Sequence, residues 1–340
     1  MCMRHLTAPL LLVLLFPTVV AAQSLGDSFG ASLDASLTSA NAFSASINPQ
    51  YPAPFSSARV SLLSSTLDLT NATLMVSSGG KRLYQGAVQT VSVPVGGAGS
   101  VTTLSIQVTS NGIPYVQTVA IQPQDISLIA EPISSAPPLY PGKPLVPLEG
   151  NTRVVAVANI RDAGGKTLDP ASLSYVWTVE NTQIANSSGI GKRSIIVASP
   201  LQYRSRNVSV VVQSQNGSLV GGASLTLTAN EPTVRIYQND PLLGILFDHA
   251  QIGTHAITAA EDTLYAAPFS FPLAGGAPVI SWFLNGAPAQ TGDLLTLRPT
   301  GVGQGTAALS VTASTGSSAE ASAELSLSFG AKRSTNFFGL

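Results

Sequence analysis

The sequence predicts an all-β fold of three tandem β-sandwiches that follow an N-terminal signal peptide. Short runs of alternating β-branched and polar residues recur at roughly 8–12-residue spacing between turn residues, and no segment has the 3.6-residue period of a helix. Asn111-Gly112 lies between two of these runs, and this dipeptide indicates a β-hairpin because both residues accept a positive φ. The whole pattern then repeats after about 100 residues, the length of a small β-sandwich.

The expected strands are short and recur in the same order in each unit. In the first unit they cover residues 59–63, 72–76, 88–93, 102–109 and 115–121. In the second and third units, corresponding strands cover residues 194–198 and 294–297, 208–213 and 307–313, and 223–228 and 323–328. Strands of this length separated by Gly, Pro, Asn and Ser favour antiparallel pairing, because antiparallel neighbours need only short turns.

The repeat is marked by tryptophan. Trp177 and Trp282 lie 105 residues apart, each inside an apolar run, and the first unit has Leu74 at the equivalent place. Their equivalence predicts core packing rather than ligand stacking, as for the central tryptophan of an immunoglobulin-like sandwich. Two Glu-Pro pairs, which begin at Glu131 and Glu231, lie 100 residues apart.

Particular strand sequences carry a family resemblance. The runs ISWFLNG, LLTLRP, TAALSVTAS and AELSLSF resemble bacterial immunoglobulin-like and PKD-like extracellular modules. The run PAPFSSARVSLLSSTLDLTNATLMVSSGGKRLYQG is similar to the N-terminal immunoglobulin-like module of exported surface proteins from candidate-phyla bacteria, often encoded near type IV pilus genes. The resemblance covers roughly residues 47–329 and implies a sandwich fold and export. It does not imply an activity, because such sandwiches host unrelated functions. The cysteine pair of antibody domains is absent from every unit.

The N-terminus has the layout of a secretory signal peptide. Arg4 precedes an apolar run over residues 6–20, and Ala22 would be the last residue removed if cleavage falls before Gln23. The run is shorter than the ~20 residues of a spanning helix, and Pro17 interrupts it. We therefore expect export to the cell surface or the extracellular space. An uncleaved segment would instead be an N-terminal membrane anchor.

The sequence divides into six segments. A signal peptide (1–22) and a Ser/Ala-rich spacer (23–45), expected to be partly disordered or weakly helical, precede three immunoglobulin-like units, at residues 46–123, 124–229 and 230–330, and a C-terminal tail, 331–340. The second unit opens with six prolines between residues 132 and 147, which predict an edge segment or a stiff connector. Together with the short junction at residues 229–232, they predict a semi-rigid rod.

Composition excludes several classes of protein. Charged residues make up 10% of the chain and the net charge is −1, which argues against a nucleic-acid partner, because that needs a clustered cationic face. The densest basic groups are Lys192-Arg193 and Arg204 with Arg206, and we interpret them as solubilising. The one cysteine, Cys2, lies within the signal peptide, so the mature chain is expected to have no disulfide and no cysteine metal site.

No catalytic, cofactor or metal site is predicted. Asp248, His249 and His255 could supply three metal ligands, but spacing alone does not show the convergence that a zinc site needs, and a strand end with a turn histidine is the preferred interpretation. Glu261-Asp262 is interpreted as a solvated turn. The glycine-rich run 301–306 lacks the last glycine of a dinucleotide loop and precedes a strand rather than a helix.

We expect an exported, non-enzymatic structural or adhesive protein of the bacterial envelope, possessing no cofactor and no small-molecule substrate. Its expected partners are other envelope or surface proteins, which would meet its sandwich faces and edge strands, as in a pilus-type assembly. The alternative is an array of carbohydrate-binding or enzyme-accessory modules acting on envelope polymers. A planar row of exposed aromatic residues would favour that alternative, whereas the aromatic content of 6% does not.

Overall fold

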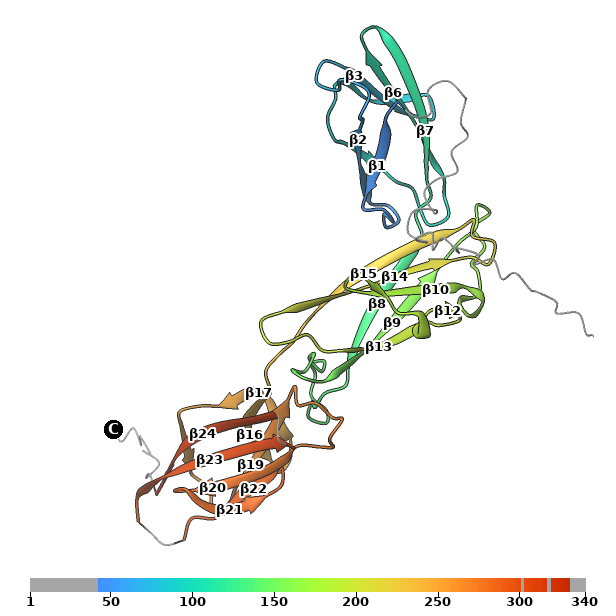
Figure 1. Ribbon diagram of the computed structural model, residues 1–340. Coiled ribbons are helices and arrows are strands. Elements are labelled where there is room, and N and C mark those ends of the chain that lie inside the picture. The colour runs from blue at the N-terminus through green and yellow to red at the C-terminus, as the bar shows by residue number, and fades with distance from the viewer. Residues whose placement is uncertain (1–41, 301–302, 317–318, 331–340) are drawn as a thin grey trace, which may run out of the picture.

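The computed structural model describes residues 42–300, 303–316 and 319–330. In these residues the chain forms three β-sandwiches that follow one another along an elongated molecule (Figure 1). The all-β expectation is confirmed, since the helices of the described residues are two single 3₁₀ turns. The predicted signal peptide, residues 23–41 of the spacer, and the C-terminal tail lie outside the described residues.

The first sandwich packs a three-stranded sheet, β1-β2-β5, on a four-stranded sheet, β4-β3-β6-β7. Its strands are β1 (Ser44–Asn48), β2 (Ser57–Leu63), β3 (Thr73–Ser78), β4 (Lys81–Ala87), β5 (Val91–Pro94), β6 (Thr102–Ser110) and β7 (Ile113–Ile121). Alternate side chains of both sheets point inward, and Leu74, Val76, Leu104 and Ile106 are completely or almost completely buried between them.

The second sandwich repeats this arrangement, with β8-β9-β13 packed on β11-β10-β14-β15 and the short β12 beside β10. Its elements are β8 (Asp125–Pro132), β9 (Asn151–Asn159), η1 (Pro170–Ser172), β10 (Ser174–Val179), β11 (Thr182–Gln183), η2 (Ala185–Ser187), β12 (Gly189–Ile190), β13 (Ser194–Ala198), β14 (Ser205–Gln213) and β15 (Val220–Thr228). Asp169 caps η1 by accepting a hydrogen bond from the Ala171 N–H through its side chain.

The third sandwich packs β17-β16-β19-β22 on β18-β24-β23-β20-β21. Its strands are β16 (Thr233–Asp240), β17 (Gly244–Gln251), β18 (Thr254–Ile257), β19 (Asp262–Phe269), β20 (Val279–Leu284), β21 (Ala287–Thr291), β22 (Leu294–Leu297), β23 (Gly305–Thr315) and β24 (Ala319–Phe329). The β18–β24 pair is parallel, whereas every other ladder between the named strands is antiparallel. The N-terminal part of this sandwich contributes to both sheets, because β16 and β17 join one sheet and β18 joins the other.

The strand order identifies the fold as immunoglobulin-like. In immunoglobulin lettering, the first two sandwiches pair strands A, B and E in one sheet and C′, C, F and G in the other, as in fibronectin type III domains. The third sandwich keeps that order and adds the β17 edge and the parallel A′ strand, β18. The predicted three tandem sandwiches are present.

The predicted strands agree best where turn residues enclose them. The expected strands 194–198 and 294–297 match β13 and β22 residue for residue. Asn111 and Gly112 both have positive φ, 51° and 78°, and join β6 to β7, so the predicted hairpin is confirmed. The expected strand 88–93 is wrong in its first half: residues 88–90 connect two strands, and β4, which begins with Lys81 and Arg82, was not predicted. Because β4 begins with two charged residues, its sequence lacks the alternation of apolar and polar residues that predicts a strand.

The spacer expected to reach residue 45 ends earlier. Phe43 is buried in the first core, and β1 begins at Ser44 and pairs with β2. This strand was not predicted because positions 44–46 are serine and alanine, which do not have the β-propensity of β-branched or aromatic residues.

The two tryptophans are equivalent, as predicted. Trp177 lies on β10 and Trp282 on β20, each with no exposed surface and each at the centre of its own core. The indole Nε1–H of Trp177 donates to the Lys192 carbonyl at 2.8 Å, and that of Trp282 donates to the Gly292 carbonyl at 2.9 Å. Each polar ring atom is thus satisfied, which is what burial of an indole requires.

Candidate functional site at the second junction

The proline-rich segment is the loop that connects β8 to β9, residues 133–150, which we call the A–B loop. It leaves the second sandwich and pairs with residues 270–273 of the third. The Ser135 N–H donates to the Phe271 carbonyl at 2.8 Å, and the Ser270 N–H donates to the Ser135 carbonyl at 3.0 Å. Ser135 Oγ also accepts from the Phe271 N–H at 3.0 Å. The segment predicted to be an edge or a connector therefore bridges two sandwiches.

The returning half of the A–B loop also pairs with the direct connection between the sandwiches. The Asn230 N–H donates to the Val146 carbonyl at 2.8 Å, and the Leu148 N–H donates to the Asn230 carbonyl at 3.1 Å. Pro147 and Asn230 form a parallel bridge. The second junction is thus crossed by the A–B loop as well as by the single connection at residues 229–232, and backbone hydrogen bonds tie the two together.

An aromatic cluster anchors the tip of the A–B loop. The ring of Tyr140 packs edge-on against Phe269 at a centroid distance of 4.9 Å, and against Phe247 at 5.5 Å. Phe247 in turn packs against Tyr237 and Tyr265. These side chains lie on the face of β16, β17 and β19 opposite the core, because side chains alternate along a strand. Burial raises the pKa of Tyr237 and of Tyr265 above the usual phenol value.

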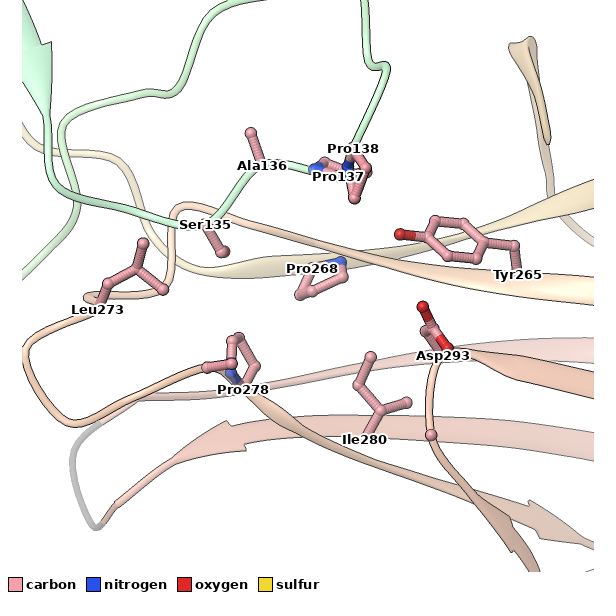
Figure 2. A pocket seen from close by; sticks show the side chains of 12 residues that line it. Ser135, Ala136, Pro137, Pro138, Tyr265, Pro268, Leu273, Pro278, Ile280 and Asp293 are labelled. Carbon is pink, nitrogen blue, oxygen red and sulfur yellow. The ribbon is translucent and has the colours of Figure 1, made fainter.

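A pocket of about 350 Å³ opens between the A–B loop and the third sandwich. Figure 2 shows side chains of both sandwiches around it: Pro137 and Pro138 from the loop, and Pro268, Pro278 and Ile280 from the third sandwich. Most of its wall is therefore apolar and conformationally stiff.

Besides Ser135, two polar side chains lie in the wall of this pocket. The Tyr265 ring and the Asp293 carboxylate are both among its lining residues (Figure 2). The carboxylate adds to burial in raising the pKa of Tyr265, since a nearby negative charge disfavours a phenolate. The proline and aliphatic walls, with a phenol and a carboxylate beside them, suit contact with an apolar group that has a polar or cationic end.

The first junction is also tightly packed. Tyr51 lies so close to Gly222 of β15 that a Cβ at Gly222 would fall 2.5 Å from the tyrosine ring. Burial of this ring raises the Tyr51 pKa. The Gly99 N–H donates to the Pro123 carbonyl at 2.8 Å, and Gln122 Nε2 donates to the Gly99 carbonyl at 3.1 Å. A side chain at Gly99, which has a positive φ, would collide with the backbone carbonyls of Arg161 and Asp162.

The three candidate metal ligands are not brought together. Asp248 and His249 are exposed on β17, whereas His255 is buried on β18. His255 Nε2 lies 2.7 Å from Asp262 Oδ2, and its Nδ1 lies 3.0 Å from Gln251 Oε1. In the part of the chain that the structure describes, no group of three or more His, Cys, Asp or Glu residues is placed to hold a metal ion.

The expectation of a solvated turn at Glu261-Asp262 is wrong for the second residue. Asp262 is the first residue of β19, and its side chain is 9% exposed and pairs with buried His255. Glu261 is exposed and forms an ion pair with Arg298 at 2.7 Å. Sequence spacing gave no signal for the His255–Asp262 pair, since neither residue stands in an unusual local pattern.

The remaining sequence candidates are dispersed. Residues 301–302 of the glycine-rich run lie outside the described residues, and Gly305 begins β23, as the strand interpretation requires. Arg206 donates to the Ala198 carbonyl at 2.8 Å, while Lys192 and Arg193 are exposed in the turn before β13. Within the described residues, the exposed aromatic side chains are Phe55 and Tyr203, which lie in different sandwiches.

The A–B loop docking was missed by sequence reasoning, although a signal was present. In β19, the run LYAAPF is apolar on both faces rather than alternating, and all four residues Leu264–Ala267 are buried. A strand with two apolar faces needs a cover on each side. The core supplies one cover and the A–B loop the other.

The fold assignment rests on the strand order rather than on similarity to known proteins. No protein-family model matches the chain, and no curated protein matches it. Solved structures that match include three N-terminal domains of the highly immunogenic outer capsid protein (Hoc) of bacteriophage RB49, at 12% identity over 85% of this chain and 99% of that chain, with a TM-score of 0.24.

Two further matches are arrays of sandwich domains. The central fibronectin-III array of RIM-binding protein is 10% identical over 83% of this chain and 93% of its own, with a TM-score of 0.29. Immunoglobulin domains 1–4 of Sidekick-1 are 11% identical over 85% of this chain and 75% of that chain, with a TM-score of 0.21. At these TM-scores the likeness carries no argument about function.

Proposed function

We propose that this chain is an exported, non-enzymatic structural or adhesive protein of the bacterial envelope or surface. In it, three immunoglobulin-like sandwiches form a stiff spacer, and sandwich faces and edge strands meet partner proteins. The observation that carries the proposal is the A–B loop, which hydrogen-bonds to residues 270–273 and packs Tyr140 on the third sandwich. An additional contact of this kind between two sandwiches restricts their relative rotation. A stiff spacer needs that restriction, whereas a flexible string of domains does not.

The chemistry of the second junction supports a binding role. The pocket beside the A–B loop offers proline and aliphatic walls with the Tyr265 phenol and the Asp293 carboxylate, which together suit contact with a protein side chain. Export rests on the signal-peptide layout of residues 1–22, and the accessory role in a pilus-type assembly rests on the resemblance of the first unit to exported surface proteins. Within the described residues, no helix has the length and apolar character needed to cross a membrane.

The carbohydrate-binding alternative needs aromatic residues gathered on one exposed face. Phe55 lies in the first sandwich and Tyr203 in the second, so the two exposed rings do not share a platform. We therefore retain the structural and adhesive proposal alone.

The proposal is tested on intact source cells. An antibody raised against the folded chain should label unpermeabilised cells, and brief protease treatment of those cells should remove the label. A strain that lacks the protein should lose attachment or surface assembly and regain it with the intact gene. Label that appears only after permeabilisation would contradict surface exposure. An unchanged surface phenotype in the deletion strain would contradict the structural role.

A further inference from the structure

The pocket beside the A–B loop has a polar end, formed by Tyr265 and Asp293. Tyr265 is 4% exposed, and Figure 2 shows its hydroxyl pointing across the pocket toward the prolines of the loop. Asp293 is exposed and lies at the same end. Within the described residues, neither the Tyr265 hydroxyl nor the Asp293 carboxylate has a hydrogen-bond or ion-pair partner. Because a largely buried polar group usually has a partner, this end of the pocket is where the polar group of a ligand would bind.

Backbone hydrogen bonds fix the segment that carries the carboxylate. The Ala266 N–H donates to the Asp293 carbonyl at 2.7 Å, and the Gly292 N–H donates to the Ile280 carbonyl at 3.0 Å. The Gly292 carbonyl also accepts from the indole N–H of Trp282 at 2.9 Å. These bonds tie Gly292 and Asp293 to β19 in one sheet and to β20 in the other. A ligand at this site therefore meets a charge that is already in place, which lowers the entropic cost of binding.

The rest of the pocket surrounds this charge with apolar walls. Of the residues that line the pocket, all of which the structure describes, Asp293 alone is charged. Pro137, Pro268 and Ile280 supply apolar surface that suits methylene groups. A basic side chain matches both parts of the pocket, because it carries a cation at the end of an aliphatic stem. Charge complementarity therefore favours lysine or arginine over an acidic or a neutral side chain.

Exposed leucines beside the pocket indicate that the basic group comes from a protein. Leu139 follows Pro138, which lines the pocket, and is 94% exposed. Its φ is 63°, in the left-handed region that leucine avoids, and such backbone conformations occur mainly at functional sites. Leu273 lines the pocket and is 38% exposed. A free amine would leave both leucines in water, whereas a protein segment would cover them.

We propose that this pocket binds a lysine or arginine side chain of a partner protein, with the cation between the Asp293 carboxylate and the Tyr265 hydroxyl. The stem of the side chain lies against the prolines, and apolar residues next to it in the partner cover Leu139. This inference rests on the proposed function and deepens it, because it gives the chemistry of the partner at the second junction. Since the A–B loop and the third sandwich both line the pocket, the inserted side chain also holds the two together.

Nuclear magnetic resonance of the full, isotope-labelled chain tests the roles of the charge and the stem. N-acetyl-lysine methylamide should shift the amide resonances of Tyr265 and Asp293 saturably. N-acetyl-norleucine methylamide has the stem without the charge, and methylammonium has the charge without the stem, so each should bind at least about fivefold more weakly. Asp293→Asn should raise the Kd of the lysine probe by at least about the same fivefold factor. The matched control is Glu324→Gln, which removes an exposed carboxylate from β24 of the same sandwich and should leave this Kd unchanged.

Dipeptide probes test whether the basic group belongs to a protein. Of two N-acetyl dipeptide methylamides that carry leucine before or after lysine, at least one should bind more tightly than the lysine probe. Leu139→Asn should abolish that gain and leave the lysine probe unaffected, because asparagine accepts a positive φ and keeps the loop conformation.

Several results would overturn the proposal. They are the absence of saturable shifts at Tyr265 and Asp293, equal affinity for the lysine and norleucine probes, and undiminished binding of the lysine probe to Asp293→Asn. Dipeptides that bind no more tightly than the lysine probe, or a gain that survives Leu139→Asn, would overturn the assignment to a protein. All of these measurements use the purified chain, so their failure is distinguishable from a failure of surface labelling or of the deletion phenotype on cells.

Discussion

Tyr140 packs edge-on against Phe269, with ring centroids 4.9 Å apart and ring planes at 70°, although Tyr140 belongs to the A–B loop of the second sandwich and Phe269 ends β19 of the third. The contact fixes the tip of the loop on a face that would otherwise expose Phe247 and two tyrosines. The backbone hydrogen bonds of Ser135 hold the same loop closer to the junction. These contacts join the A–B loop to the third sandwich at its tip and at its base, which is what the proposed stiff spacer requires.

Tyr140→Ala is expected to loosen the second junction. Each aromatic pair contributes about 0.5–1.5 kcal/mol beyond its buried area, and the substitution removes two pairs. The A–B loop should then be cut faster by a protease of broad specificity, and the third sandwich should melt at a lower temperature. Tyr203→Ala, at a ring that is 93% exposed, is the control and should change neither. Equal cleavage rates in the two variants would show that Tyr140 does not hold the loop.

Trp177→Ala and Trp282→Ala should each destabilise mainly their own sandwich. Replacing a fully buried tryptophan leaves a cavity and costs about 3–5 kcal/mol. Calorimetry should show one transition shifted down in each variant and the transitions of the other sandwiches little changed. Trp177→Phe and Trp282→Phe should each lower the free energy of unfolding less than the alanine variants do, since most of the ring volume remains. A variant that kept its melting temperature and lost partner binding would point to a ligand platform instead.

Asp262→Ala and Glu261→Ala separate a buried partner from an exposed one. Loss of Asp262 leaves the Nε2 atom of buried His255 without its hydrogen-bond partner, which costs about 1–3 kcal/mol. Loss of Glu261 removes only an exposed pair with Arg298, worth about 0–1 kcal/mol. Denaturant unfolding should therefore show a clear loss of stability of the third sandwich in the first variant and little change in the second. Equal losses would refute a structural role for the His255–Asp262 pair.

Gly112→Ala should destabilise the first sandwich. Gly112 has a φ of 78°, and a side chain in this left-handed region costs about 1–2 kcal/mol. Gly275→Ala is the control, because a Cβ there meets no atom within 4 Å and its φ is not positive. The free energy of unfolding from a denaturant titration should fall for the first variant and stay level for the second. An unchanged free energy of unfolding for Gly112→Ala would mean that the hairpin can adopt a different turn conformation at no cost.

Local patterns in the sequence predicted much of the fold, whereas contacts between residues far apart in the sequence could not be predicted from them. Asn111-Gly112 and the apolar runs around Trp177 and Trp282 act within a few residues, so the hairpin and the two cores could be located. β4 begins with Lys81 and Arg82, and its place in the sheet comes from pairing with β3 rather than from its own pattern.

The junction and the buried His255–Asp262 pair depend on tertiary placement. The docking of Tyr140 joins residues more than 100 positions apart, and a proline-rich loop has the same local composition whether or not it is covered. The partial signal was the absence of alternation in β19, which indicates a strand covered on both faces but not the segment that covers it.

Small-angle X-ray scattering from the chain in solution tests the central claim most directly. A compact globule of this length would have a radius of gyration of about 20 Å, and three sandwiches in line must exceed that value clearly. We expect an elongated pair-distance distribution with separate maxima for distances within and between sandwiches, and a Kratky plot that returns toward the baseline. A radius near that of one globule, or a Kratky plot that keeps rising as for flexibly linked domains, would contradict a stiff array braced by the A–B loop.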